Sequence, residues 1–294
     1  MVDDHKSNVF FVIITAASVL LRIKDEPLNK LLSNRLILFV PGILLILGVF
    51  SPPSLSGEAE KEPVQIDEEI PDLIEKADLY FAHIHQDISG LKKAAHLYET
   101  VLHKQPDHQE AHWKLSEILF VSAMETGEKS AQKEFYKQSI EHAEQVLQAD
   151  PLCVPALFYS GYAHISLADT AGMIGAVSLL KKGKKELTRT MEYAPGNRFG
   201  ILAACVLSQI NTDVPWPLKD LKEAEKLARQ AVAWDPVLTL ARVQLATVFR
   251  HQKKYEAARV EARRCLAITS PTYISDAVLW DWPAARSILE KTDQ

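Results

Sequence analysis

The sequence has few glycines and few cysteines, and its charge is nearly balanced. Eleven glycines among 294 residues, with hydrophobic residues at 47%, are too few for a turn-rich barrel or sandwich and favour an all-α protein. The three cysteines, Cys153, Cys205 and Cys265, form no CxxC pair, which argues against a closely spaced metal site or redox dithiol. The 33 basic and 38 acidic residues supply no general electrostatic reason to bind nucleic acid.

The sequence also lacks the motifs of several enzyme classes. A glycine-rich phosphate loop is missing, since the run Lys181–Lys185 (KKGKK) has one glycine and no preceding strand. No GxSxG nucleophile elbow occurs. His108 and His112 stand four residues apart, but without an HExxH motif or an acidic cluster we interpret them as surface histidines. We therefore expect no catalysis, no cofactor and no metal site.

Two hydrophobic runs open the chain, at residues 8–21 and 36–50. Each is shorter than the roughly 20 apolar residues that span a bilayer. Basic residues between the runs would stay in the cytoplasm and place the rest of the chain outside it. The second run has Arg35 before it and small residues after it, in the order of an export signal. We therefore predict a membrane or signal region over residues 1–50.

The fate of this N-terminal region has several interpretations. The segments could be retained and tether the protein, or cleavage near Ser56 could release it into the periplasm. A start of translation between the two runs would make residues 36–56 an ordinary cleavable signal, and two buried helices of a soluble protein are a further alternative. Residues 51–66 mix proline, serine and charge without periodicity, and we predict a linker there. In the first two cases residues 67–294 face the periplasm or another extracytoplasmic side.

Prolines mark an internal repeat in residues 67–294. Each follows a helical run and stands 35 to 45 residues from the next; they are Pro106, Pro151, Pro195, Pro236 and Pro271. Proline suits a helix start and is excluded from helix interiors, so these junctions separate helices. The pattern predicts about five helix pairs, followed by a capping helix near residues 276–291.

The repeat predicts two positions per unit where paired helices cross closely. Each proline is taken as a fixed position near the end of a unit of about 34 residues. The first position falls on Ala82, Ser116, Gly161, Cys205 and Ala246. The second falls on Ala94, Ser139, Gly183, Ala224 and Ala258, the last counted from the preceding junction. All ten side chains are small, as a close crossing requires.

Two segments show best what this repeat resembles. Gly90–Pro106 (GLKKAAHLYETVLHKQP) and Tyr255–Pro271 (YEAARVEARRCLAITSP) are similar to tetratricopeptide repeats. The resemblance implies an all-α superhelix of antiparallel helix pairs. Three units exceed the usual length, and we expect their extra residues to extend helices in the second and third units. In the fourth they form a loop at Asn211–Asp220 (NTDVPWPLKD).

The long middle repeats, the segment SAMETGEK and the late Pro-Trp-Pro loop resemble the T component associated with TRAP-type transporters. A more distant likeness is to the regulator of microtubule dynamics family. The first resemblance implies an exported accessory protein that sits beside a solute-binding protein in the uptake of small ligands. The chain differs from that family in lacking its lipid-accepting cysteine.

The first helices of such pairs line a concave surface, the usual binding face of these arrays. The residues expected there are Trp113, Glu117, Phe120, Phe158, Tyr162, Ile165, Leu202 and Val206. Two interpretations of this aromatic patch are open. It could be exposed and bind a partner or an apolar ligand, or the lengthened helices could cover it as core.

These observations predict a non-enzymatic, membrane-tethered adaptor of an extracytoplasmic complex. In the form that the T-component resemblance implies, it is an accessory of a TRAP-type transporter, with a solute-binding protein or an apolar ligand as its partner. The alternative is a general scaffold for assembling envelope or membrane complexes. An oligomer is compatible with the aromatic segment at Trp280–Trp282, although we expect that segment to pack within the capping helix.

Overall fold

The computed structural model describes residues 69–214 and 218–292. The predicted N-terminal region (1–50), the linker (51–66) and the Pro-Trp-Pro segment (215–217) lie outside the described residues. The helices are α1 (Ile70–Ala82), α2 (Gly90–Lys104), α3 (Gln109–Glu125), α4 (Lys129–Ala149), α5 (Val154–Ala168), α6 (Met173–Tyr193), α7 (Arg198–Asp213), α8 (Leu221–Trp234), α9 (Thr239–His251), α10 (Tyr255–Leu266), α11 (Ile274–Asp276), η1 (Ala277–Asp281) and α12 (Trp282–Thr292). None of the described helices combines the length and hydropathy needed to cross a membrane.

Two kinds of helix build the array. In α8, a buried stripe of Ala224, Leu227, Ala228 and Ala231 repeats at three- and four-residue steps and leaves the opposite face polar. In α7, by contrast, every residue from Phe199 to Thr212 is buried. A helix that is buried on all sides belongs to the centre of the molecule, and α7 therefore anchors the array between its N-terminal and C-terminal halves.

The prolines separate the helix pairs as expected. At all five junctions the next helix begins three residues after the proline, as at Pro106 before Gln109 and at Pro236 before Thr239. The extra residues of the middle units extend α4 and α6 to 21 residues each. Among the described residues the result is five antiparallel helix pairs, with α12 packed against α10 as the capping helix.

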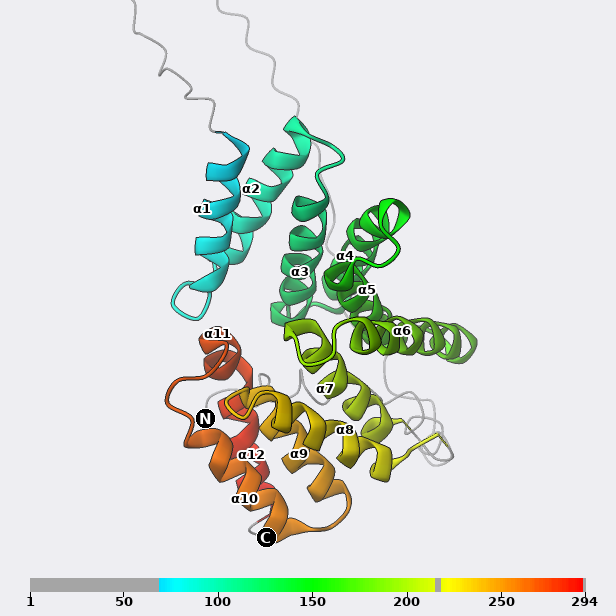
Figure 1. Ribbon diagram of the computed structural model, residues 1–294, viewed down its shortest axis with the longest axis vertical. Coiled ribbons are helices and arrows are strands. Elements are labelled where there is room, and N and C mark those ends of the chain that lie inside the picture. Colours follow the sequence, from blue (N-terminus) through cyan, green and yellow to red (C-terminus); the bar gives the residue numbers. More distant parts are fainter. Residues whose placement is uncertain (1–68, 215–217, 293–294) are drawn as a thin grey trace, which may run out of the picture.

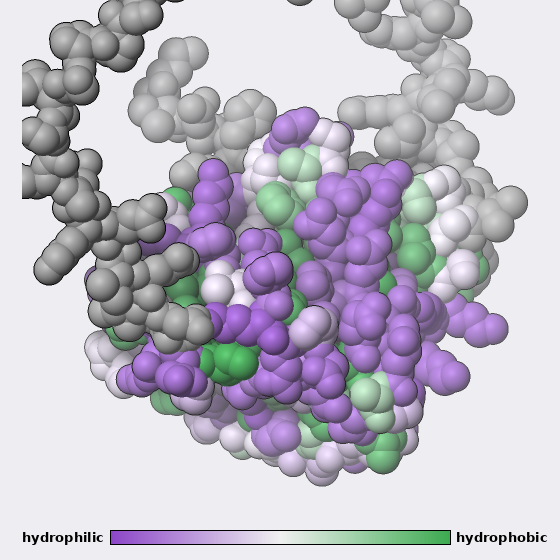
Figure 2. Space-filling view, turned by 90° about the horizontal axis from the view of Figure 1, so that it is seen from above, coloured by the Kyte–Doolittle hydropathy of each residue, from purple (hydrophilic) through white to green (hydrophobic). Residues whose placement is uncertain are grey.

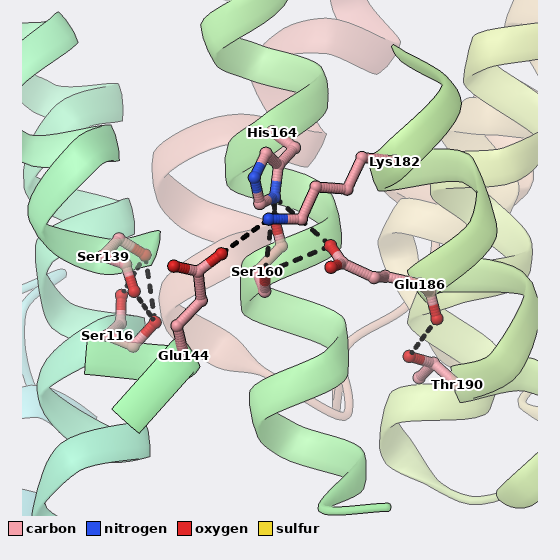
Figure 3. A network of polar contacts seen from close by, with 8 residues as sticks. All are labelled: Ser116, Ser139, Glu144, Ser160, His164, Lys182, Glu186 and Thr190. Carbon is pink, nitrogen blue, oxygen red and sulfur yellow. Dashed lines mark hydrogen bonds and ion pairs between the residues drawn. The ribbon is translucent and has the colours of Figure 1, made fainter. Parts of the chain in front are cut away.

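The predicted crossings are confirmed at nine of the ten positions, where the small residue is buried. Ser116 and Ser139 each donate a hydrogen bond to the other's backbone carbonyl, at 2.7 and 2.8 Å (Figure 3). The prediction for Ala82 was wrong, because this residue is exposed at the end of α1. Ala77, in the same helix, is fully buried instead. The turn between α1 and α2, residues 83–89, is longer than the one assumed in a unit of about 34 residues.

The array curves back on itself. Figure 1 shows the helix pairs stacked along the chain, with α11 beside the loop that follows α1. There the Ser275 hydroxyl donates a hydrogen bond to the Ala82 carbonyl at 3.0 Å, and the His85 ring lies 2.9 Å from the same hydroxyl. Residues 272–281, which we call the closing segment, therefore join the last repeat to the first.

The face of the molecule shown in Figure 2 is mainly polar. In the face shown in Figure 2, hydrophobic residues are scattered among hydrophilic ones instead of gathering into one broad patch. The large hydrophobic side chains that are exposed, such as Leu79, Leu152 and Val177, come from helices or turns far apart along the chain. A binding site is therefore better sought on the concave side than on this outer surface.

Candidate functional site

A cavity of about 430 Å³ lies on the concave side of the array. Its walls come from α1, α3, α5, α7, α9 and the closing segment. Cavities of a few hundred cubic ångströms at the junction of several elements are the usual form of a ligand site. The site is assembled only when the chain curves back, because its walls span residues 78 to 281.

Most of the residues predicted for the concave surface line this cavity. They are Glu117, Phe120, Phe158, Tyr162, Leu202 and Val206. The other two do not border it. Trp113 packs edge-on against Phe199, with ring centroids 6.1 Å apart. Ile165 is 1% exposed and packs against Gly183 at the crossing of α5 and α6. Whether any of these residues binds a ligand stays a prediction.

Both interpretations of the aromatic patch describe part of it. Phe120 and Phe158 are only 4% and 3% exposed, so they belong to the core. Phe120 packs against Tyr162 with ring centroids 4.4 Å apart, and Phe158 lies 5.9 Å from the same ring. The rings therefore cover one another, and all three residues also line the cavity. The patch forms a rigid wall rather than an open groove.

A buried ionic cluster stands in this wall. Glu117, 3% exposed, accepts a hydrogen bond from the Tyr159 hydroxyl at 2.5 Å and a shorter one from the Arg198 guanidinium. The guanidinium also lies over the rings of Phe199 and Tyr273, 4.9 and 5.3 Å from their centroids. Glu117 is thus satisfied within the fold, and burial raises the pKa of Tyr159 well above its usual value.

The closing segment brings two further carboxyl groups to the cavity, those of Asp276 and Asp281. Burial raises the pKa of Asp276 to about 7, against the attraction of Arg198. Burial and repulsion by Asp276 raise the pKa of Asp281 to about 8, although Thr239 donates a hydrogen bond to its carboxyl at 2.6 Å. Both groups therefore titrate near neutral pH, which is unusual for carboxylic acids.

Residues 78 and 114 complete the charged groups of the cavity. The Lys114 ammonium is 2.6 Å from the Asp78 carboxylate, which also accepts a hydrogen bond from the Tyr98 hydroxyl at 2.5 Å. This pair, like that of Glu117 and Arg198, brings one positive and one negative charge together. Asp276 and Asp281 are the acidic residues of the cavity beyond these two pairs.

A serine and histidine pair at the edge of the cavity is arranged for structure. Because the Ser275 hydroxyl donates its proton to the Ala82 carbonyl, the His85 ring must donate to the Ser275 oxygen. A histidine in that role cannot take the serine's proton, as a general base would. The contact therefore holds the closing segment to the loop after α1.

A second such group, Ser160, His164 and Glu186, lies at the crossing of α5 and α6 (Figure 3). His164 Nδ1 is 2.7 Å from the backbone carbonyl of Ser160, and the Ser160 hydroxyl donates to Glu186 at 3.1 Å. The histidine thus donates its Nδ1 hydrogen bond to a backbone carbonyl, and the serine donates its hydrogen bond to a carboxylate. With Ser160 and His164 buried, the group satisfies polar atoms inside a helix crossing.

The described part of the chain holds no cluster of metal ligands, and its two buried cysteines are not activated. No three potential metal ligands among histidine, cysteine, aspartate and glutamate gather there. The nearest approach is His112 with His142, whose Nδ1 atoms are 2.9 Å apart. Burial raises the pKa of the Cys205 thiol and raises that of Cys265 to about 12, so both stay protonated and unreactive.

Part of the chain matches a known family, and most of it is similar to solved structures. The model of a family described as regulator of microtubule dynamics protein 1-3 matches residues 73–200, somewhat less than half of the chain. No match is found among curated protein sequences. Among solved structures, a thermophilic TPR protein of Thermus thermophilus is 14% identical, with a TM-score of 0.59 over 76% of this chain and all of that one. The chain has a tetratricopeptide repeat fold.

Two other solved structures are similar at lower TM-scores. MamA is 13% identical, with a TM-score of 0.42 over 63% of this chain and 92% of that one. YrrB, described as a TPR protein with an unusual peptide-binding site, is 16% identical, with a TM-score of 0.40 over 71% of this chain and 96% of that one. The match to the regulator family supports the distant likeness seen in the sequence. The likeness to the TRAP-associated T component is not confirmed.

Proposed function

We propose that the protein is a non-enzymatic binding scaffold that holds part of a partner in the cavity of its concave side. The observation that carries this proposal is the cavity itself, which is built by five helices and the closing segment. Its charged pairs and serine–histidine contact are engaged in holding the fold. The groups left at the cavity, aromatic rings with a few polar side chains, are typical of a recognition site.

A pull-down with a blocked cavity tests this proposal. Val206, which is 2% exposed and lines the cavity, is replaced by tryptophan to fill the space. Solubilised membranes are passed over the immobilised wild type and V206W, and captured proteins are identified by mass spectrometry. A partner held in the cavity should be captured by the wild type and lost by V206W.

The matched control is Leu218→Trp, which adds the same side chain at a site that is 65% exposed. This variant should capture the partner as well as the wild type does. Circular dichroism checks that both variants are folded. A partner captured equally by all three proteins binds elsewhere, and the cavity would then not be its site. Phe158→Ala is a poor alternative, because removing a core phenylalanine costs about 3–5 kcal/mol of stability.

We further propose that the scaffold works on the extracytoplasmic side of a membrane. The support is the sequence of residues 1–50, with its hydrophobic runs at 8–21 and 36–50 and the basic residues between them. In the tethered form these segments stay attached, and in the secreted form the chain is cut near Ser56. Membrane fractionation with N-terminal sequencing of the mature protein separates the two forms. An intact residue 1 would rule out the cleavage.

A second candidate is an accessory role in solute uptake, beside a solute-binding protein of a TRAP-type transporter. The size of the cavity favours this candidate, since about 430 Å³ suits a small molecule better than an extended peptide. Genes for a solute-binding protein and two membrane subunits beside this one, together with co-purification of their products, would support the role. Co-purification with unrelated assembly factors instead would favour the general scaffold.

A further inference from the structure

The walls of the cavity carry a specific combination of chemical groups. They include the aromatic rings of Phe120, Tyr162 and Trp280 and the carboxyl groups of Asp276 and Asp281. Aromatic rings attract cations through their negative faces, and carboxylates attract them through charge. Both kinds of wall therefore favour the same kind of guest.

The shape of the closing segment places its two carboxyl groups together. Residues 277–281 form a π-helical turn, in which hydrogen bonds join residues five apart. Side chains five apart then lie near one another, whereas in an α-helix they diverge by about 140°. Asp276 and Asp281 are five apart and border the same cavity. A wider helical turn of this kind is frequent at functional sites.

The other charges of the cavity leave these two carboxyl groups without a cation of their own. Lys114 is paired with Asp78, and Arg198 is paired with Glu117. Burial raises the pKa of Asp276 more than Arg198 lowers it. Burial and Asp276 raise the pKa of Asp281, and the hydrogen bond from the Thr239 hydroxyl lowers it. An arriving positive charge would be met by two carboxyl groups ready to ionise.

We propose that the cavity binds a compact organic cation, an ammonium or guanidinium group on an apolar body, between the aromatic rings and the carboxyl groups of Asp276 and Asp281. This inference rests on the proposed function and names the chemistry of the bound group. The cation has two sources, a free amine or the lysine or arginine side chain of a partner protein. Its binding at neutral pH displaces protons from Asp276 and Asp281, because a nearby positive charge favours their ionised form.

Isothermal titration calorimetry on the full-length protein tests the inference with two matched probes. The probe 2-phenylethylammonium carries the cation, and 2-phenylethanol has the same body without charge. At pH 7 we expect the ammonium to bind at least ten-fold more tightly. Buffers of different ionisation enthalpy should reveal proton release on binding. A third probe, Nα-acetyl-lysine N-methylamide, tests whether a protein side chain is accepted as well as a free amine.

Variants separate charge recognition from general binding. D276N and D281N should each reduce the preference for the ammonium and the proton release, and the double variant should abolish the release. D213N is the control, since Asp213 is a largely buried carboxyl with a pKa raised to about 6 by burial, but lies outside the cavity wall. It should keep the preference intact.

The outcomes distinguish this inference from the proposed function. Equal binding of the ammonium and the alcohol would overturn the cation site and leave the cavity as an apolar binding site. A preference that survives in D276N/D281N would also overturn it. Failure of all three probes to bind would overturn the inference too, whereas the scaffold function would still be decided by the V206W pull-down.

Discussion

At the scale of single residues, Gly161 in α5 and Gly183 in α6 let the two helices cross at van der Waals contact. A Cβ atom added at Gly183 would lie 2.5 Å from the Gly161 carbonyl oxygen and 2.8 Å from two side-chain carbons of Ile165. Because the oxygen belongs to the backbone, the helices would have to move apart. We expect Gly183→Ala to lower the free energy of unfolding by about 1–3 kcal/mol, measured by urea denaturation.

The same substitution in the same helix supplies the control. At Gly175 an added Cβ would meet the Ala171 side chain alone, at 3.4 Å. Alanine is the better helix former, so Gly175→Ala should raise stability by up to about 1 kcal/mol. If the two variants changed stability equally, close approach of the helices would not be the reason for glycine at position 183.

The acidic residues of the closing segment predict how stability changes with pH. The folded-state pKa values of Asp276 and Asp281, about 7 and about 8, lie above the usual 3.8. Between about pH 4 and pH 8 the folded state therefore binds more protons than the unfolded state. The contribution of these groups to stability is complete below pH 4 and is lost as the pH rises toward 8.

We expect Asp281→Asn to flatten this dependence by up to about 1.4 kcal/mol per pH unit, the value for one proton. Urea denaturation at several pH values from 5 to 8 measures it. Glu256→Gln is the control, because Arg259 lowers the pKa of this exposed carboxyl and its titration falls below that range. An unchanged slope in D281N would show that Asp281 is already ionised at pH 5.

Sequence reasoning worked for residues whose role is local in the repeat, and failed for those whose role depends on distant parts of the chain. The small residues at the crossings follow from spacing, and only Ala82 was misplaced, by the long turn after α1. Glu117 was predicted as a groove residue, but its partner Arg198 is 81 residues away. The carboxyl groups of Asp276 and Asp281 gave no signal, since nothing in the sequence shows what lies opposite them.

At the scale of elements, α7 illustrates how a helix start is fixed locally. Asn197 precedes the helix with extended backbone, and its side-chain oxygen accepts a hydrogen bond from the Gly200 amide at 3.1 Å. Asn197 itself is exposed, and burial begins at Phe199, so the contact fixes the helix start at the surface. We expect Asn197→Ala to lower the free energy of unfolding by about 1 kcal/mol, measured by thermal denaturation.

Asn197→Asp tests the same contact, because the carboxylate keeps the accepting oxygen and suits the positive end of the helix dipole. It should retain most of the stability that alanine loses. Equal losses in the two variants would mean that the amide group of Asn197 has another role. The proline junctions let the sequence place this helix start correctly, whereas the π-helical turn at 277–281 has no comparable signature in spacing or composition.

At the scale of the whole molecule, closure of the array makes the cavity, and closure is the feature that sequence reasoning missed. A repeat pattern describes neighbouring units, so it predicts helix pairs but not how far the superhelix curves. The contacts that join the ends, from Ser275 to His85 and from Trp280 to Glu125, span 190 and 155 residues. The concave surface, for which the sequence left an exposed and a buried interpretation open, is therefore a cavity with the closing segment in its wall.

The hydrogen bond from the Trp280 indole to the Glu125 carboxylate, 2.8 Å long, should control how often the closing segment opens. Trp280→Phe keeps a ring at that position and removes the donor, and Glu125→Ala removes the acceptor. Each should raise hydrogen exchange in residues 277–281 about five-fold, the effect of roughly 1 kcal/mol, with little change in α8. Mass spectrometry of the exchanged peptides measures both regions.

Combining the two changes tests whether they act through one contact. The double variant should exchange no faster than either single variant, because the bond can be lost only once. Glu125→Gln, whose amide oxygen can still accept the indole proton, should stay close to the wild type. Additive effects in the double variant would show that Trp280 and Glu125 act through separate contacts. A ligand seated beneath the segment would then slow exchange independently of Glu125.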